Sequence, residues 1–335
     1  MIESYRQLGH TGLKVSPICL GTMMFGGPTQ ESDAIDIIHE AIDFGINFID
    51  TANMYNAGES EVVTGKALAG KREQVVLATK AGQKMGDGPL DKGASRKHLM
   101  FALEESLRRL NTDYVDLYYI HVPDYDTPLE ETMRALDDMI HSGKVRYIAC
   151  SNFRTWKLAE ATLLSSQFNL HSFCCVQPLY NIVNRDIEVD LLPYCEANGL
   201  GVVSYSPLAR GILTGKYKPD GTVPEGSRAS RNDARMKQAE WRQESLEAAA
   251  ALEQHCDTKG VACSQFALAW VLANPILSSV IIGPRTKEQF RDNLECLKID
   301  VTTDDEAFVD SLVPPGEHSG KGFQDDAYPI TGRPV

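Results

Sequence analysis

The chain has 335 residues, of which 43% are hydrophobic, 24% charged and 8% aromatic, and these proportions are ordinary for a globular protein. The 33 basic and 46 acidic residues give a formal charge of −13, which disfavours binding to nucleic acid or to an anionic membrane surface, since no basic run offsets it. No apolar run approaches the roughly 20 residues of a membrane helix. An anionic cofactor would therefore need a locally positive site.

The start of the chain and its cysteines both favour a cytoplasmic location. Residues 1–6 lack the basic region followed by an apolar segment that a secretory signal requires. The eight cysteines are scattered, mostly within apolar runs, without the CxxC spacing or nearby histidines of a zinc site. We expect buried, reduced thiols, no bond between the adjacent Cys174 and Cys175, and no metal.

The predicted elements begin with a hairpin, in which Tyr5–Leu8 and Leu13–Val15 flank a turn at Gly9–Gly12. Amphipathic helical stretches separate most of the runs that follow, and Ser95 is a predicted cap for one of them. The eight short apolar runs are Ile18–Leu20, Asn47–Ile49, Val75–Ala78, Val115–Ile120, Tyr147–Cys150, Phe173–Val176, Gly201–Tyr205 and Ser279–Ile282. This alternation predicts parallel strands, either closed into a (β/α)8 TIM barrel or arranged as an open doubly wound sheet.

Two segments interrupt the alternation. Residues 208–243, after the seventh strand, form a predicted long loop that is rich in Gly, Pro, Arg and Asp, and loops of that length are usually functional or mobile. The tail, residues 314–335, contains prolines that exclude a normal helix. Because no linker or break in composition divides the series, we expect a single domain over residues 1–335 with an irregular tail.

Two common phosphate-binding motifs are missing. An open nucleotide-binding sheet should carry GxGxxG after its first strand, and the sequence has no such motif there. Residues 211–217 superficially resemble a phosphate loop. However, three residues rather than four separate Gly211 from Gly215, and Tyr217 stands where Ser or Thr should bind magnesium. We therefore reject a nucleotide site of either type.

Four titratable residues lie at or just after the ends of neighbouring predicted strands. Asp50, Lys80 and His121 end three strands, and Tyr55 lies in the loop after Asp50. Each alone has a structural explanation, but barrel enzymes keep their chemistry at the carboxyl ends of strands. Together they indicate a site in which the carboxylate holds the ammonium and the ammonium lowers the tyrosine pKa from about 10. The phenol could then donate a proton while the histidine orients a carbonyl oxygen.

Seven segments in order resemble the aldo-keto reductases: FIDTANMY, VVLATKAG, YYIHVPD, IACSNF, VQPLYN, VVSYSPLARGILTGK and IIGPRTKEQF. The resemblance extends from Leu8 to about Leu297. It implies a single (β/α)8 barrel and NAD(P)H-dependent reduction of aldehydes or ketones to alcohols, reversible in principle. Tyr55 then matches the general acid, Asp50 and Lys80 match the pair that tunes it, and His121 matches the group that orients the carbonyl.

The resemblance also implies a cofactor site. Ser151, Asn152 and Gln177 match residues that hydrogen-bond the nicotinamide carboxamide, and Tyr205 matches the aromatic on which the nicotinamide stacks. Capping of a helix near residue 155 is an alternative role for Ser151 and Asn152, compatible with the first. Arg285 is a locally positive residue that could pair with a 2′-phosphate, which favours NADPH/NADP+ over NADH. The other cofactor candidates are Gly21, Thr22, Asp50, Ser206, Leu208, Gly211, Gly283, Gln289 and Asn293.

Met23, Phe25, Val122 and Phe153 are candidates for the lining of a substrate pocket, although simple loop packing is the alternative for such residues. Two rival functions stay open. One is a cofactor-binding, redox-sensing regulatory subunit, because the sequence is also similar to potassium-channel β subunits. The other is NADP+-dependent alcohol oxidation as the working direction. The expected partner is a small carbonyl compound, with no nucleic acid and no membrane, and the sequence does not indicate which carbonyl or which oligomeric state.

Overall fold

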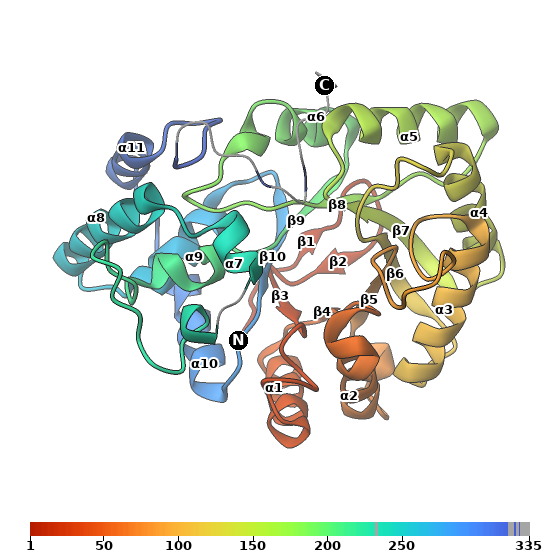
Figure 1. Cartoon of the computed structure of the whole chain (residues 1–335), viewed down its shortest axis with the longest axis horizontal. Helices are drawn as coiled ribbons and strands as arrows, with labels where there is room; N and C mark the ends of the chain where they lie inside the picture. The colour runs from red at the N-terminus through yellow and green to blue at the C-terminus, as the bar shows by residue number, and fades with distance from the viewer. Residues whose placement is uncertain (232–233, 321–324, 326–327, 329–335) are drawn as a thin grey trace. The chain divides into compact units, whose positions relative to one another are not determined.

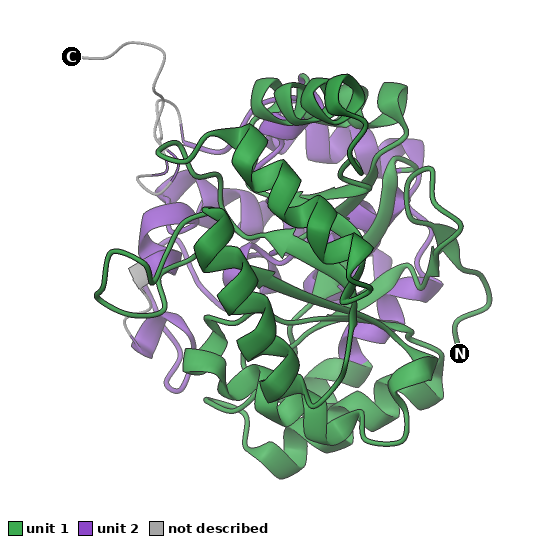
Figure 2. Cartoon of the chain, turned by 90° about the vertical axis from the view of Figure 1, so that its right-hand side faces the viewer, with its two compact units in different colours: residues 1–178, 190–205, 275–291 green, residues 179–189, 206–274, 292–335 purple. Residues whose placement is uncertain are grey.

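The computed structural model describes residues 1–231, 234–320, 325 and 328. The chain divides into two compact units, which are coloured separately in Figure 2. The first comprises residues 1–178, 190–205 and 275–291, and the second comprises residues 179–189, 206–274 and 292–335. The single domain over residues 1–335 stays a prediction.

The first unit contains a closed barrel of eight parallel strands, in the order β10-β3-β4-β5-β6-β7-β8-β9 (Figure 1). Each predicted apolar run overlaps one of these strands, so the (β/α)8 barrel is confirmed and the open sheet is wrong. Every residue of β4 and β5 is buried, as is typical of parallel strands covered on both faces. The strands are β3 Ile18–Gly21, β4 Phe48–Asp50, β5 Val76–Ala81, β6 Val115–Ile120, β7 Val145–Ser151, β8 Cys175–Gln177, β9 Gly201–Ser204 and β10 Leu277–Ile282.

Helices connect these strands within the first unit. They are α1 Glu31–Phe44, α2 Glu59–Ala67, α3 Arg96–Leu110, α4 Leu129–His141, α5 Thr155–Phe168 and α6 Leu191–Asn198, with the 3-10 turns η1 Tyr55–Gly58 and η2 Arg72–Gln74. The predicted cap at Ser95 is confirmed, because its hydroxyl accepts a hydrogen bond from the backbone N–H of His98. In contrast, α5 follows Arg154 without a side-chain cap, so capping by Ser151 or Asn152 is wrong.

The predicted hairpin is confirmed, and it closes the amino end of the barrel. Its strands are β1 Arg6–Gln7 and β2 Lys14–Val15. Arg6 donates to the carbonyl of Leu277, the first residue of β10, at 2.9 Å. Leu8 is fully buried and joins the cluster of side chains that forms the barrel core, with Val15, Cys19, Phe48, Val76, Ala78, Leu117, Tyr119, Ala149, Cys175 and Val203. The carboxyl end of the barrel is therefore the end at which a site can form.

The regular elements among the described residues of the second unit are helices and 3-10 turns. It holds α7 Ala234–Ala239, α8 Gln243–Lys259, α9 Cys263–Ala273 and α11 Thr303–Leu312, with η3 Asp186–Glu188, η4 Ala209–Thr214, η5 Ala229–Arg231 and η6 Glu295–Lys298. The predicted long loop, residues 208–243, thus carries short helical turns between irregular stretches. The helix α10 Lys287–Leu294 begins in the first unit and ends in the second.

Part of the predicted tail lies outside the described residues. Residues 314–320 form turns without a helix. All eight cysteines are free, and all but the partly exposed Cys174 are buried. Among the described helices, none combines the length and the apolar character needed to cross a membrane.

Replacement of Gly9 should destabilise the barrel. Gly9 has φ +56°, and a Cβ there would lie 2.6 Å from two main-chain atoms, the oxygen of Cys174 and the nitrogen of Gly201. Cys174 directly precedes β8 and Gly201 begins β9, so Gly9→Ala should lower the free energy of unfolding by about 1–3 kcal/mol. Urea unfolding followed by circular dichroism measures the change.

Gly12 gives a matched control in the same turn. A Cβ at Gly12 would meet no atom within 4 Å, so Gly12→Ala should change the free energy of unfolding by less than about 0.5 kcal/mol. Equal losses in the two variants would contradict the close contact at Gly9.

Candidate active site

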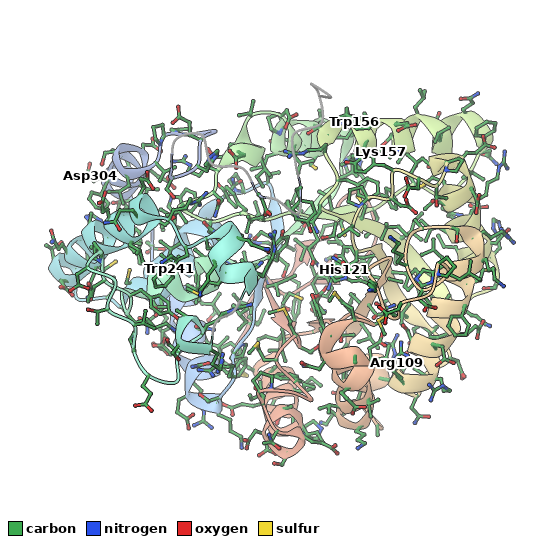
Figure 3. The ribbon with its side chains drawn as sticks, viewed as in Figure 1. Arg109, His121, Trp156, Lys157, Trp241 and Asp304 are labelled. Carbon is green, nitrogen blue, oxygen red and sulfur yellow. The ribbon has the colours of Figure 1, made fainter. Side chains whose placement is uncertain are left out.

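The four titratable residues predicted from strand ends meet within the first unit. Asp50 is the last residue of β4, Lys80 is the penultimate residue of β5, and His121, labelled in Figure 3, directly follows β6. Tyr55 opens the turn η1, five residues after Asp50. Because β4, β5 and β6 are parallel neighbours, their carboxyl ends lie side by side and bring these side chains together.

A buried ion pair joins Lys80 to Asp50. The two side chains are 0% and 2% exposed, and the ammonium contacts Oδ1 of the carboxylate. The ammonium also donates to the carbonyl of Thr51 at 2.8 Å. Burial by itself lowers the pKa of Lys80, but the Asp50 carboxylate and the Tyr55 oxygen outweigh burial, and the pKa of Lys80 is raised. The ammonium is therefore charged at neutral pH.

Tyr55 lies between this cation and an imidazole. Lys80 donates to the Tyr55 hydroxyl at 3.4 Å, and the ring of His121 packs edge-on against the Tyr55 ring with centroids 5.8 Å apart. Burial, and then the charge of Lys80, lowers the pKa of His121 well below its ordinary value. His121 is thus neutral at pH 7, with one ring N–H to donate.

The turn that presents Tyr55 has an unusual backbone. Asn56 and Ala57 have φ values of 48° and 55°, in the left-handed region that residues other than glycine rarely adopt. The Asn56 side chain stabilises the turn, because its Nδ2 donates to the carbonyls of Met23 and Phe25 at 3.0 and 2.7 Å. The loop after β3 is thereby tied to the turn, and the phenol is held in place.

A chain of hydrogen bonds runs from the ion pair to Tyr205. Gln177 Nε2 donates to Asp50 Oδ2 at 2.9 Å, and the Ser151 hydroxyl donates to the Gln177 main-chain carbonyl at 2.8 Å. Asn152 Nδ2 donates to Ser151 Oγ at 3.0 Å, and Asn152 Oδ1 accepts from the Tyr205 hydroxyl at 2.7 Å. The structure therefore brings these predicted cofactor residues together beside Asp50.

These residues fit an aromatic amide such as nicotinamide. The Tyr205 ring is partly exposed and is anchored by its hydroxyl, so it can contact a stacked ring. In the preceding residue of the chain, Ser204, the buried hydroxyl has no hydrogen-bond partner among the described residues. A buried polar atom of this kind indicates a group that binds there.

The candidates at the end of β3 are fixed by packing. Thr22 is fully buried, and its hydroxyl shares a hydrogen bond of 2.7 Å with that of Ser60. A Cβ at Gly21 would lie 2.6 Å from Cγ2 of Ile281 in the neighbouring strand. Both positions need small residues for these contacts, and their cofactor role stays a prediction.

The candidates near α10 are more open. Gly283 follows β10, and a Cβ there would meet no atom within 4 Å. Arg285 is partly exposed just before α10, and its backbone N–H donates to Oε1 of Gln289 at 2.9 Å. Gln289 therefore supports the backbone at Arg285. Arg285 thus lies just before the first residue of this helix, and the amino end of a helix is a place where an anion is favoured.

The remaining cofactor candidates, Ser206, Leu208, Gly211 and Asn293, belong to the second unit. Ser206 and the residues Ala209–Gly211 all have positive φ. Backbones of this kind can direct N–H groups into a concavity that binds anions. Asn293 is buried in α10. The role of these four residues stays a prediction.

The substrate-pocket candidates differ in their exposure. Met23 is exposed and Val122 is partly exposed. Phe25 is fully buried, and Phe153 is 4% exposed and packs edge-on against Phe173 with centroids 5.7 Å apart. For the two phenylalanines the structure favours loop packing, while Met23 and Val122 keep contact with solvent.

Sequence reasoning missed a set of polar residues behind the site. Glu61 of α2 is fully buried and accepts from Arg109 of α3 at 2.7 Å and from Thr79 of β5 at 2.5 Å. The neighbouring Ser60 shares a hydrogen bond of 3.1 Å with Thr51. The only sign of these contacts in the sequence was the adjacent polar pair Ser60 and Glu61, which precedes an apolar pair in α2. The sequence did not show which face of this helix is buried.

Comparison with known proteins shows the family to which the chain is similar. The Aldo/keto reductase family model matches residues 17–314. An uncharacterized oxidoreductase of Bacillus subtilis, YrpG, is 39% identical over 331 residues, which cover 95% of this chain and 99% of the relative. A probable voltage-gated potassium channel subunit beta of Arabidopsis thaliana is 36% identical over 301 residues, 88% and 91% of the two chains. Versiconal hemiacetal acetate reductase of Aspergillus parasiticus is 32% identical over 345 residues, 93% and 99% of the two chains.

The lowered pKa of His121 predicts a pH dependence of stability. In the unfolded chain the imidazole titrates near its ordinary value of about 6.5. Below that pH the unfolded state binds a proton that the folded state does not, so stability should fall as pH falls. The variant His121→Gln should flatten the decrease below about pH 6.5, measured by thermal unfolding over a pH series. A decrease as steep as that of the unmodified protein would contradict a buried neutral imidazole.

Proposed function

Because the chain belongs to the aldo/keto reductase family, we propose that it is an NADPH-dependent oxidoreductase that reduces aldehydes or ketones to alcohols, with Tyr55 as the proton donor. The family match and relatives that cover nearly the whole chain support an oxidoreductase. Members of this family generally use NAD(P)H. The observation that carries the residue assignment is the buried Lys80 ammonium, which contacts Asp50 and donates to the Tyr55 hydroxyl.

Tyr55 is the group suited to protonate the substrate. A bound reduced nicotinamide supplies the hydride for this reaction. As the carbonyl oxygen gains negative charge, Tyr55 gives it the phenolic proton. The Lys80 ammonium, 3.4 Å from the phenolic oxygen, stabilises the phenolate that is left. Asp50 keeps that ammonium in position, because an unpaired charge at this depth would be strongly unfavourable.

His121 orients the carbonyl rather than protonating it. Its lowered pKa keeps the imidazole neutral, so the ring offers the carbonyl oxygen a hydrogen bond without an additional charge. A protonated imidazole would compete with Tyr55 as the acid. The burial of His121 and its closeness to Lys80 therefore leave proton donation to the tyrosine.

The candidate cofactor residues of the first unit would bind the nicotinamide end of the cofactor. Ser151, Asn152 and Gln177 would hydrogen-bond its carboxamide, and Tyr205 would stack against its ring. These four residues already form one chain of hydrogen bonds that ends on Asp50. Because Asn152 Nδ2 already donates to Ser151 Oγ and to the main-chain carbonyl of His121, the carboxamide would take the place of some of these hydrogen bonds.

A second candidate function has specific support. The chain is 36% identical to a probable voltage-gated potassium channel subunit beta over 88% of its length, which favours a redox-sensing regulatory subunit that uses the same site. Alcohol oxidation with NADP+ is the same chemistry in the reverse direction, in which Tyr55 accepts the proton. All three functions need the same four residues, so kinetics rather than geometry distinguishes them.

Loss of the Tyr55 hydroxyl should nearly abolish turnover. Tyr55→Phe keeps the ring and its contact with His121 but removes the proton, and loss of a general acid costs about 10²- to 10⁴-fold in rate. NADPH affinity, measured by fluorescence titration, should change by less than about twofold, since the hydroxyl acts mainly in the transition state. A panel of aldehydes and ketones, with NADPH absorbance followed over many turnovers, measures the rate.

Tyr5→Phe is the control, because the exposed Tyr5 hydroxyl donates to the carbonyl of Gly45 and should not affect the rate. Full activity of Tyr55→Phe would contradict its assignment as the acid. Oxidation that stops at one equivalent of NADPH in the unmodified protein would favour the regulatory subunit. Faster NADPH formation from alcohols than its consumption by carbonyls would favour oxidation.

The preference for NADPH should depend on Arg285. A charge-assisted hydrogen bond to the 2′-phosphate is worth about 1.5–3 kcal/mol, so Arg285→Gln should raise the KM for NADPH about tenfold or more and leave that for NADH nearly unchanged. Lys287→Gln is the matched control: it removes a neighbouring cation that already pairs with Asp36 at 2.5 Å. Equal effects on the two cofactors would contradict recognition of the phosphate by Arg285.

A further inference from the structure

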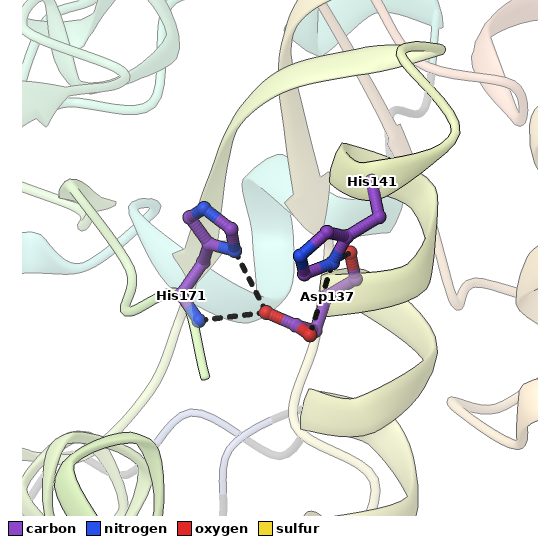
Figure 4. Close-up of side chains that lie close together, drawn as sticks. All are labelled: Asp137, His141 and His171. Atoms are coloured by element: carbon purple, nitrogen blue, oxygen red, sulfur yellow. Dashed lines mark hydrogen bonds and ion pairs between the residues drawn. The ribbon is translucent and has the colours of Figure 1, made fainter. Parts of the chain in front are cut away.

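Asp137, His141 and His171 form a side-chain cluster on the first unit, near the amino ends of β7 and β8 (Figure 4). Asp137 and His141 lie one turn apart on α4, and His171 lies between α5 and β8. Each offers a possible ligand atom, and these atoms lie within 4.8 Å of one another. Among the described residues, no other group of three His, Cys, Asp or Glu side chains meets this criterion.

The carboxylate of Asp137 is the fixed centre of the cluster. It is largely buried, and its Oδ1 accepts from the backbone N–H of His171 at 2.8 Å and from Nδ1 of His171 at 2.7 Å. Its Oδ2 lies 3.2 Å from Nδ1 of His141, and the same nitrogen lies 2.9 Å from the main-chain carbonyl oxygen of Asp137. Burial by itself raises the pKa of Asp137, but these neighbours outweigh burial and lower the pKa, so the carboxylate is ionised.

The two imidazole rings, in contrast, are accessible. The side chains of His141 and His171 are 67% and 49% exposed, so each ring can rotate about its side-chain bonds. A cavity of about 430 Å³ borders the cluster and is lined partly by His171 and Arg146. A hydrated ion can therefore reach the ring of His171 without unfolding of the surrounding helices.

We propose that Asp137, His141 and His171 bind a divalent late first-row transition ion, with zinc as the best match. Two imidazoles and one carboxylate form a known type of three-residue zinc site, in which water takes a fourth position. Metal–ligand bonds of about 2.0–2.2 Å place ligand atoms roughly 3–3.5 Å apart. The separations of 2.7 and 3.2 Å from the carboxylate are already close to that range. Metal binding would require a change of orientation only in the imidazole rings of His141 and His171.

The bound ion would replace the present hydrogen bonds of the two imidazole rings. Each neutral ring would turn an Nδ1 lone pair toward the ion and keep its proton on Nε2. The ion would also join α4 to the segment before β8, through ligands 34 residues apart in the chain.

A metal titration tests the site without reference to catalysis. Tag-free protein treated with a chelator is titrated with Zn²⁺ by calorimetry and with Co²⁺ by visible absorption. We expect one equivalent of either ion to bind and Zn²⁺ to raise the unfolding temperature. His141→Gln and His171→Gln should each weaken binding at least tenfold, since even partners of metal ligands commonly contribute about 10–100-fold.

His318→Gln is the matched control. His318 pairs through Nδ1 with the carboxylate of Asp186 at 2.7 Å, in a pair with no second histidine, and its replacement should leave metal affinity unchanged. Unfolding temperatures in chelator show that the variants fold. Absence of binding by the unmodified protein, or equal binding by the double variant His141→Gln/His171→Gln, would overturn the proposal.

Discussion

The buried contact between Lys80 and Asp50 is the interaction on which the candidate active site depends. An ammonium without access to water is tolerated only beside a compensating charge, and removal of one partner of such a pair commonly costs about 3–5 kcal/mol. Asp50 satisfies Lys80 through one carboxylate oxygen and binds Gln177 through the other. The same carboxylate therefore holds in place both the cation beside Tyr55 and the first of the residues that are candidates for binding the nicotinamide.

The barrel explains why these side chains can be held so closely. Each strand delivers one or two residues to the same end, and the parallel register sets their separation. The turn after β4 adds a strained backbone at Asn56 and Ala57, stabilised by hydrogen bonds from Asn56 to the loop after β3. Strain of this kind persists where the surroundings determine the conformation, and here the surroundings place a phenol beside a cation.

Much of this arrangement could be predicted from the sequence, because apolar runs and strand-end residues are local signals. Asp50, Lys80 and His121 each follow such a run, and the barrel brings them together without further information. The contact of Glu61 with Arg109 could not be predicted in this way, since 48 residues separate the two and neither belongs to a motif. The burial of Phe25 was also hidden, because a loop sequence does not show which side chain turns inward.

The hairpin packs at the amino end of the barrel, whereas the candidate active site lies at the carboxyl end. Leu8 and Gly9 pack against the starts of the strands, at the opposite end from the loops that follow β3 and β6. Exchange of the exposed loop residues around Met23 or Val122 would therefore leave the packed base of the barrel intact. A scaffold of this kind suits grafting experiments, in which loops from relatives are transplanted while Asp50, Tyr55, Lys80 and His121 stay in place.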